Sequence, residues 1–229
     1  MKINSKTIAR FFFYALGMIT LAFGIILNTK SNLGVSPIIS VAYCASRITG
    51  INFGDATFVW YSIFVVFEVI VHIPKKKYKL IIPDLLQIVV SLVFTRFMNL
   101  FSAMIPMTTD MSSDTFYGSM VGRLFIALIG IILTGIGAAM SLNARLIPNP
   151  GDGVVQTLAD LINKSVGLTK NIWDIGCVSL TCILGLTVLH RLEGVGIGTI
   201  LAMILVGRVV AVYNYLLKDK VDKLSGIES

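Results

Sequence analysis

Charged side chains are scarce in this sequence of 229 residues, in which Asp, Glu, Lys and Arg together make up 14% and hydrophobic residues 55%. A water-soluble domain of this length needs more charge than that to cover its surface, so a soluble fold is excluded. No stretch has the composition of a separate soluble domain. We therefore expect one membrane domain over residues 1–229, with short connections between its helices.

Cysteine and histidine are sparse as well. The three cysteines lie in apolar stretches without metal-ligand spacing, and there are two histidines. HExxH, GxSxG and GxGxxG patterns are absent. The sequence therefore predicts no enzyme activity, no cofactor and no metal site. The net charge of +7 comes from Lys and Arg at the ends of apolar runs, where they orient membrane proteins, so no nucleic-acid partner is expected.

Six apolar runs are long enough to cross a bilayer as helices, which takes about 20 residues. The first is interpreted as a retained helix rather than a cleaved leader. Two further helix-like segments, 37–49 and 151–164, are shorter, and their length predicts half-helices or re-entrant segments. The six predicted spans are 8–28, 55–73, 80–103, 119–142, 171–190 and 195–217.

The loop charges support this count. With both termini in the cytoplasm and the short segments not crossing, thirteen Lys and Arg residues lie inside and four outside. If both short segments crossed, the basic cluster at 74–79 would lie outside and the split would be ten against seven. The excess of Lys and Arg in cytoplasmic loops thus favours six spans with cytoplasmic termini.

The chain also contains an internal repeat. Three pairs of identical residues share one offset in sequence number, whereas the offset between Gly50 and Gly167 is slightly larger, which predicts a short insertion in the second half. A fixed offset held along most of the chain indicates two copies of one unit; the alternative is chance alignment of Gly-rich apolar sequence. Three spans per copy make the copies inverted, over about 8–103 and 119–217. The three pairs that define the repeat offset are Gly17/Gly130, Gly24/Gly137 and Pro37/Pro150.

The linkers before the two prolines are candidates for a site. A linker of about nine residues can reach from the surface to mid-membrane, and Pro suits the first turn of a helix that begins there. The two helix N-termini then meet, and their free N–H groups favour an anion. A substrate or ion site is predicted here; the alternative is two buried turns that only pack the fold. Its residues are Gly34, Ser36, Pro37, Pro150, Gly151 and Asp152.

Two arginines, Arg96 and Arg208, lie inside predicted spans, and their separation is within one position of the repeat offset. An intramembrane Arg usually faces a partner or a water-filled cavity. We expect both arginines to belong to the substrate or ion site, with Asp152 binding a cation or proton and Arg208 an anionic substrate group. The alternatives are snorkelling to the surface or a structural pair with an aspartate.

The other ionisable residues inside or near the spans fall into two groups. Glu68 and His72 lie four apart on one helical face. They could relay protons, but the preferred interpretation is a contact at the membrane interface. Asp55, Asp84 and Asp174 fall near the starts of spans and are expected to complement the helix dipole.

The Gly- and Pro-based motifs resemble those of the YczE/YyaS/YitT family of bacterial membrane proteins. The similar motifs are 32–37 (NLGVSP), 148–153 (PNPGDG) and 194–199 (GVGIGT), and the resemblance covers about 8–217. Family members often carry an acidic residue two positions after the first Pro. This chain has Ile39 there but keeps Asp152 in the second copy. The resemblance implies a protein of the bacterial cytoplasmic membrane without naming a substrate.

The expected fold is therefore all-α, a six-span bundle of two inverted three-span repeats, each with a half-helix. Such folds are common among secondary transporters, whose sites lie near the midplane. Transport of a small solute, an unidentified molecule or ion, is the favoured function. The alternatives are a sensor or assembly factor acting through its cytoplasmic loops, and a passive channel. Expected partners are the lipid bilayer and possible further copies of the chain in a homo-oligomer, which close packing of Gly-rich spans permits.

Overall fold

The computed structural model describes residues 5–227 of the chain, and this part contains helices and no strand. A short 3₁₀ turn, Thr108–Asp110, follows α4, and a π-helical turn, Gly185–Leu189, continues α7. The α-helices are α1 (Ser5–Lys30), α2 (Pro37–Thr49), α3 (Phe53–His72), α4 (Tyr78–Met104), α5 (Met120–Asn143), α6 (Pro150–Ile162), α7 (Val166–Leu184) and α8 (Ile197–Ser225).

Six helices of the described part are long and apolar enough to cross a membrane: α1, α3, α4, α5, α7 and α8. The helices α2 and α6 have 13 residues each, or roughly 20 Å at 1.5 Å per residue, which is too short. The predicted set of spans and short segments is thus recovered. The largest shift is at the end of α8, which runs to Ser225 instead of about 217. The helix α7 begins at Val166 instead of about 171, because Ser165 caps its first turn by accepting a bond from the Leu168 amide.

The polarity of the bundle is that of a protein dissolved in lipid. Along α3 a stripe of Val59, Ile63, Val66 and Ile70 is more than half exposed. The opposite face of the same helix buries the carboxyl group of Glu68, which is 1% exposed. Water favours the reverse arrangement, whereas hydrocarbon favours apolar side chains outside and paired polar groups inside. The chain therefore has the architecture of an integral membrane protein.

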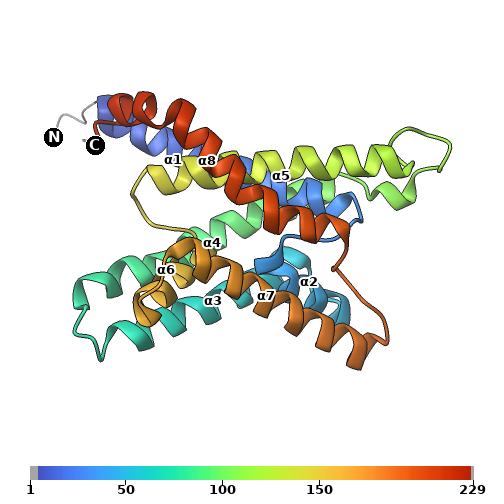
Figure 1. Cartoon of the computed structure of the whole chain (residues 1–229), viewed down its shortest axis with the longest axis horizontal. Helices are drawn as coiled ribbons and strands as arrows, with labels where there is room; N and C mark the ends of the chain where they lie inside the picture. The colour runs from blue at the N-terminus through green and yellow to red at the C-terminus, as the bar shows by residue number, and fades with distance from the viewer. Residues whose placement is uncertain (1–4, 228–229) are drawn as a thin grey trace.

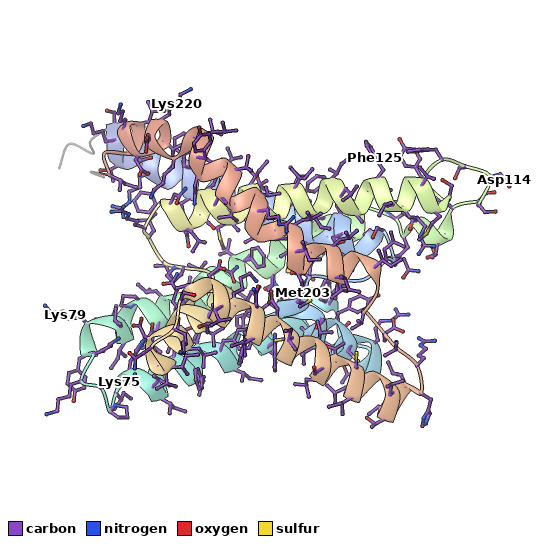
Figure 2. All side chains as sticks on the ribbon, viewed as in Figure 1. Lys75, Lys79, Asp114, Phe125, Met203 and Lys220 are labelled. Carbon is purple, nitrogen blue, oxygen red and sulfur yellow. The ribbon has the colours of Figure 1, made fainter. Side chains whose placement is uncertain are left out.

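The helices form two groups (Figure 1). In this view α1, α5 and α8 lie together, α2, α3, α6 and α7 form the other group, and α4 runs from the second group to the first. Both termini and the 73–77 turn lie at one end of the bundle, which we name the termini side. The 104–118 segment lies at the opposite end, which we name the loop side; Figure 2 shows Lys75 and Lys79 at the first end and Asp114 at the second.

The helices α1 and α5 cross in direct backbone contact. A Cβ atom added at Gly24 would lie 2.5 Å from the Thr134 amide nitrogen and 2.7 Å from the Gly130 carbonyl oxygen. One added at Gly137 would lie 2.3 Å from the Leu21 nitrogen and 2.7 Å from the Gly17 oxygen. Small residues allow such close approach between membrane helices, so these glycines set the distance between the two helices.

The same local features recur at the repeat offset in the two halves. Ser36 and Asn149 precede the short helices, and Asn52 and Ser165 cap the helices that follow. The short helices end in left-handed residues, Gly50 with φ 74° and Asn163 with φ 53°. The expected equivalence of Gly50 with Gly167 is therefore wrong. Asn can also adopt the left-handed conformation, so the second half needs no glycine there and carries no insertion.

Candidate functional site

The two short helices begin inside the bundle, at the ends of linkers 31–36 and 144–149. Pro37 and Pro150 occupy their first turns, where the missing N–H has no intrahelical partner. The side chain of Asn149 caps α6 by accepting a 3.0 Å hydrogen bond from the Gly151 amide. Ser36 makes no such bond. The first turn of α2 therefore keeps an amide group without a side-chain acceptor.

Each linker is held by an arginine from the opposite half. Arg10 donates hydrogen bonds to the carbonyl oxygens of Ala144 and Arg145 at 2.6 and 2.5 Å. Arg123, its counterpart at the repeat offset, donates to those of Ser31 and Asn32 at 3.0 and 2.6 Å. Each guanidinium thus neutralises the partial negative charge at the end of a helix and fixes the point at which the linker turns inward.

A cavity of about 230 Å³ lies beside the two N-termini. Most of its wall is apolar, from helices α1, α5, α6 and α8. It extends toward the termini side, because Leu142, Val166 and Lys170 belong to the ends of α5 and α7 that face that side. Its polar lining residues are Ser36, Tyr61, Thr134, Asn149, Asp152, Gln156 and Lys170.

The charges at the cavity do not balance. Lys170 donates a 2.9 Å hydrogen bond to the Oδ2 atom of Asp174, whose side chain is 3% exposed. Asp152 is half-buried on the cavity wall and lies within electrostatic range of both. Two carboxyl groups therefore share one ammonium group, and a cation or proton is favoured near Asp152. The buried Nδ2 atom of Asn149 has no partner, which leaves a hydrogen-bond donor beside the same cavity.

A second cavity, of about 1000 Å³, lies on the loop side. The two cavities are lined by different residues, and the segment Leu33–Val35 stands between them, paired with 194–198. Val35 donates to the Gly194 carbonyl at 2.9 Å, and Gly198 donates to that of Leu33 at 2.7 Å. Charged side chains on the loop-side cavity are Lys30, Arg47, Asp110, Arg191 and Glu193.

Gly34 belongs to this pairing and not to the small cavity. Its φ of 123° lies in the region that favours glycine, and an added Cβ would lie 2.3 Å from the Thr199 Oγ1 atom. The close approach of the two segments therefore requires glycine at this position.

Of the other predicted site residues, Ser36, Gly151 and Asp152 line the small cavity. Pro37 and Pro150 are buried beside it as the first residues of their helices.

The two arginines lie elsewhere. Arg96 is bonded to Asp55, and both side chains are about half exposed. Arg208 is exposed and does not line the cavity, although its neighbour Gly207 does. The cation available beside Asp152 is therefore Lys170.

Lys170 was missed because the sequence placed it in a loop before the span. The signal was its spacing, since Lys170 and Asp174 are four apart and face the same side of a helix. Asp174 was expected to complement a helix dipole but is bound to Lys170. Tyr61 gave no signal, because an isolated Tyr in an apolar segment does not indicate a cavity.

Comparison with known proteins places the chain in a family. A family model described as a family of unknown function, DUF6198, matches residues 8–215. The chain is 24% identical over 207 residues to the uncharacterized protein YyaS of Bacillus subtilis (strain 168), covering 89% of this chain and 92% of that protein. These matches confirm the resemblance to the YyaS type. No solved structure matches the chain. With nearly its whole length matched, the chain belongs to the DUF6198 family.

Proposed function

We propose that this protein is a secondary transporter of a small polar solute, built from two inverted repeats. The observation that carries the proposal is the cavity beside the N-termini of α2 and α6, with Asp152 and Lys170 on its wall. Broken helices that expose their N-termini in mid-membrane are the usual binding elements of such transporters.

The inverted repeat is supported by reciprocal contacts. Gly17 of α1 lies against Gly137 of α5, and Gly24 against Gly130. At the repeat offset, Gly130 is the counterpart of Gly17, and Gly137 is the counterpart of Gly24. The contact between Gly17 and Gly137 is therefore repeated, with the two halves exchanged, by the contact between Gly130 and Gly24. Reciprocity of this kind is the property of a two-fold axis. The arginine pair Arg10 and Arg123 obeys the same rule, since each binds the linker of the other half.

We further propose that the protein lies in the bacterial cytoplasmic membrane with both termini in the cytoplasm. The basic residues of the 73–79 segment and those described near the two ends of the chain gather on the termini side, where Figure 2 labels Lys75, Lys79 and Lys220. The loop side carries fewer basic residues in its connections, as expected for an outer surface.

The size and charge of the cavity favour a small solute with a positively charged group. Its volume is below the roughly 300–1,000 Å³ of pockets for drug-sized ligands. A positive group would meet Asp152, and an acceptor on the solute would find the Nδ2 atom of Asn149 and the uncapped amide at the start of α2. The apolar walls leave room for a short hydrocarbon portion.

Access to the cavity supports alternating movement. On the loop side, Leu33–Val35 and 194–198 are joined by two backbone hydrogen bonds. On the termini side, linker 144–149 is bonded to α1 through Arg10 and Tyr14. Within the described residues no backbone hydrogen bond joins it to 81–85 of α4, the segment that lies at the repeat offset from 194–198. This conformation is therefore interpreted as closed to the outside and open toward the cytoplasm.

A ligand screen tests the proposal across several classes of solute. The purified protein is melted in the presence of each standard amino acid, small amines and short carboxylates, and compared with Asp152→Asn. A bound solute raises the melting temperature, by about 2.7 kcal/mol of stability at a concentration 100 times Kd. Loss of the Asp152 charge is expected to weaken binding about tenfold or more, since hydrogen bonds to charged groups contribute about 1.5–3 kcal/mol.

Asp114→Asn is the matched control, because Asp114 is exposed in the loop-side segment. Solutes that stabilise the protein are then tested for uptake into liposomes that contain it. The proposal fails if no solute is taken up, or if Asp152→Asn binds and transports as the unaltered protein does. The first result would favour a sensor or assembly factor.

A further inference from the structure

A second set of buried polar side chains lies behind α6, away from the cavity, between α3, α4 and α6. It contains two carboxyl groups, Glu68 and Asp84, together with His72 and Gln87. Their exposed fractions are 1%, 4%, 4% and 1%, respectively. Burial of this degree is rare for ionisable groups in membrane proteins and marks functional positions.

Within this set, the His72 Nδ1 atom is 2.7 Å from the Oδ2 atom of Asp84, and its Nε2 atom is 3.4 Å from the Thr157 hydroxyl. The expected interpretation of Glu68 and His72 as an interfacial contact is therefore wrong, because both are enclosed. Asp84, expected to complement a helix dipole, is the partner of His72.

Glu68 is paired with Gln87 in an incomplete way. The Gln87 Nε2 atom donates a 2.8 Å hydrogen bond to the Oε2 atom of Glu68. The other two oxygens, Oε1 of Glu68 and Oε1 of Gln87, are buried without a partner. Both face Gly153 of α6, where an added Cβ would lie 2.8 and 2.7 Å from them. Two unpaired acceptors in the same buried space are unfavourable.

A single proton on Glu68 would give both unpaired oxygens a hydrogen bond. A carboxylic acid and a primary amide can exchange two hydrogen bonds, the amide N–H donating to one acid oxygen and the acid O–H donating to the amide oxygen. Half of this pair, from Gln87 Nε2 to Glu68 Oε2, is already present. A proton on Glu68 Oε1 would supply the other half by donating to Gln87 Oε1.

Asp84 also lies within hydrogen-bond reach of Glu68, and two neighbouring carboxyl groups in a buried space favour the retention of a proton. The α3 helix contributes Glu68 and His72 to this space, α4 contributes Asp84 and Gln87, and α6 contributes Thr157 and the backbone of Gly153. Lys77, in the 73–77 turn, is bonded to Asp160 at 2.8 Å. On α7, Lys170 is bonded to Asp174. Within the described residues, no group of acidic, His and Cys side chains could hold a metal ion.

We propose that Glu68 holds an exchangeable proton on Oε1, donated to Gln87, and that release of this proton displaces α6. Gly153 lies against the pair while the adjacent Asp152 lines the cavity, so α6 connects the two sites. This proton is the driving ion of transport; that last statement rests on the proposed function. Release transfers the proton from Glu68 to water and leaves a buried carboxylate facing the Gln87 oxygen, a repulsion that α6 relieves by moving away.

Infrared titration of the protein in liposomes tests the proton directly and needs no solute. A protonated carboxyl group has its own carbonyl stretching band. We expect a band that is lost as the pH is raised and that Glu68→Gln lacks, in addition to any band from the other carboxyl groups, Asp152 among them. Asp55→Asn is the control, since Asp55 is paired with Arg96 at the surface, and should retain the band. Persistence of the band in Glu68→Gln, or its absence from the unaltered protein, would overturn the proposal.

The link to α6 is tested by the rate at which a cysteine in place of Gln156 reacts with a thiol reagent. Gln156 is exposed on α6 and lines the cavity, and the three native cysteines are replaced by alanine. The rate should change severalfold across the pH range in which the band disappears. In Glu68→Gln the reaction rate should keep its low-pH value at every pH, because the amide N–H of the new glutamine donates to Gln87 in place of the acid proton. A change of equal size in Glu68→Gln would refute the link.

The two proposals fail in different ways. If the band and the cysteine respond as expected but no solute is taken up, transport is wrong and the proton site stands. If a solute is taken up at the same rate, with the same pH dependence, by Glu68→Gln and the unaltered protein, the driving role of this proton is wrong and transport stands.

Discussion

Replacement of Gly24 by alanine tests the contact between α1 and α5. The new Cβ would lie 2.5 Å from the Thr134 nitrogen and 2.7 Å from the Gly130 oxygen, about 1 Å closer than ordinary van der Waals contact. Both neighbours are backbone atoms of a helix and cannot turn aside, so the helices must separate. Overpacking of this kind destabilises proteins by about 1–3 kcal/mol.

Gly176→Ala is the matched control. Gly176 lies inside α7, and an added Cβ meets nothing within 4 Å. Alanine has the higher helix propensity, by up to about 1 kcal/mol, so this variant should be as stable as the unaltered protein or more so. The difference between the two variants then reports the steric contact and not the loss of glycine.

Thermal melting of the purified proteins measures the effect. For chains of about 150–250 residues, 1 kcal/mol corresponds to roughly 2–4 °C, so Gly24→Ala should melt several degrees below Gly176→Ala. Gly137→Ala should behave like Gly24→Ala, because Gly137 makes the reciprocal contact. Equal melting temperatures for Gly24→Ala and Gly176→Ala would refute the close backbone contact.

Two further variants test the linkers. Arg123→Gln should lower the melting temperature, because it removes two hydrogen bonds from a charged donor, each contributing about 1.5–3 kcal/mol. Arg96→Gln is the control, because it breaks a half-exposed pair of about 0–1 kcal/mol. An equal loss of melting temperature in both variants would contradict the role of Arg123. Gly34→Ala should separate Leu33–Val35 from 194–198, so that a cysteine at position 156 becomes reactive toward an impermeant thiol reagent added on the loop side. Unchanged protection of that cysteine would show that these segments do not close the cavity, and Gly50→Ala, at another left-handed glycine with nothing within 4 Å, controls for local strain.

Features set by nearby residues could be predicted from the sequence. Span length, the two prolines and the repeat offset located the six long helices and the two short ones. The prediction was wrong where it matched residue types instead of conformations, as with Gly50 and Gly167. Asn163 adopts the same left-handed turn as Gly50, and a search for identical residues could not find it.

The site was less predictable because it depends on contacts between distant segments. The pairing of Leu33–Val35 with 194–198 joins opposite ends of the sequence and leaves no periodic pattern. Whether an intramembrane charge faces the interior depends on the rotation of its helix. Arg208 and Glu68 both lie inside spans, yet Arg208 is exposed and Glu68 is enclosed.

The interface opposite Glu68 differs in chemistry between the two halves. At the repeat offset the counterpart of Glu68 is Thr181, whose hydroxyl lies 2.7 Å from that of Ser40, and Gly153 is the counterpart of Ser40. One interface thus places the carboxyl group of Glu68 against Gly153. The other places two hydroxyl groups together, and neither of them releases a proton near neutral pH. If Glu68 drives transport, this interface contributes one proton to each turnover, so the uptake of a solute whose positive group is balanced by a negative one generates a measurable electric current across the membrane.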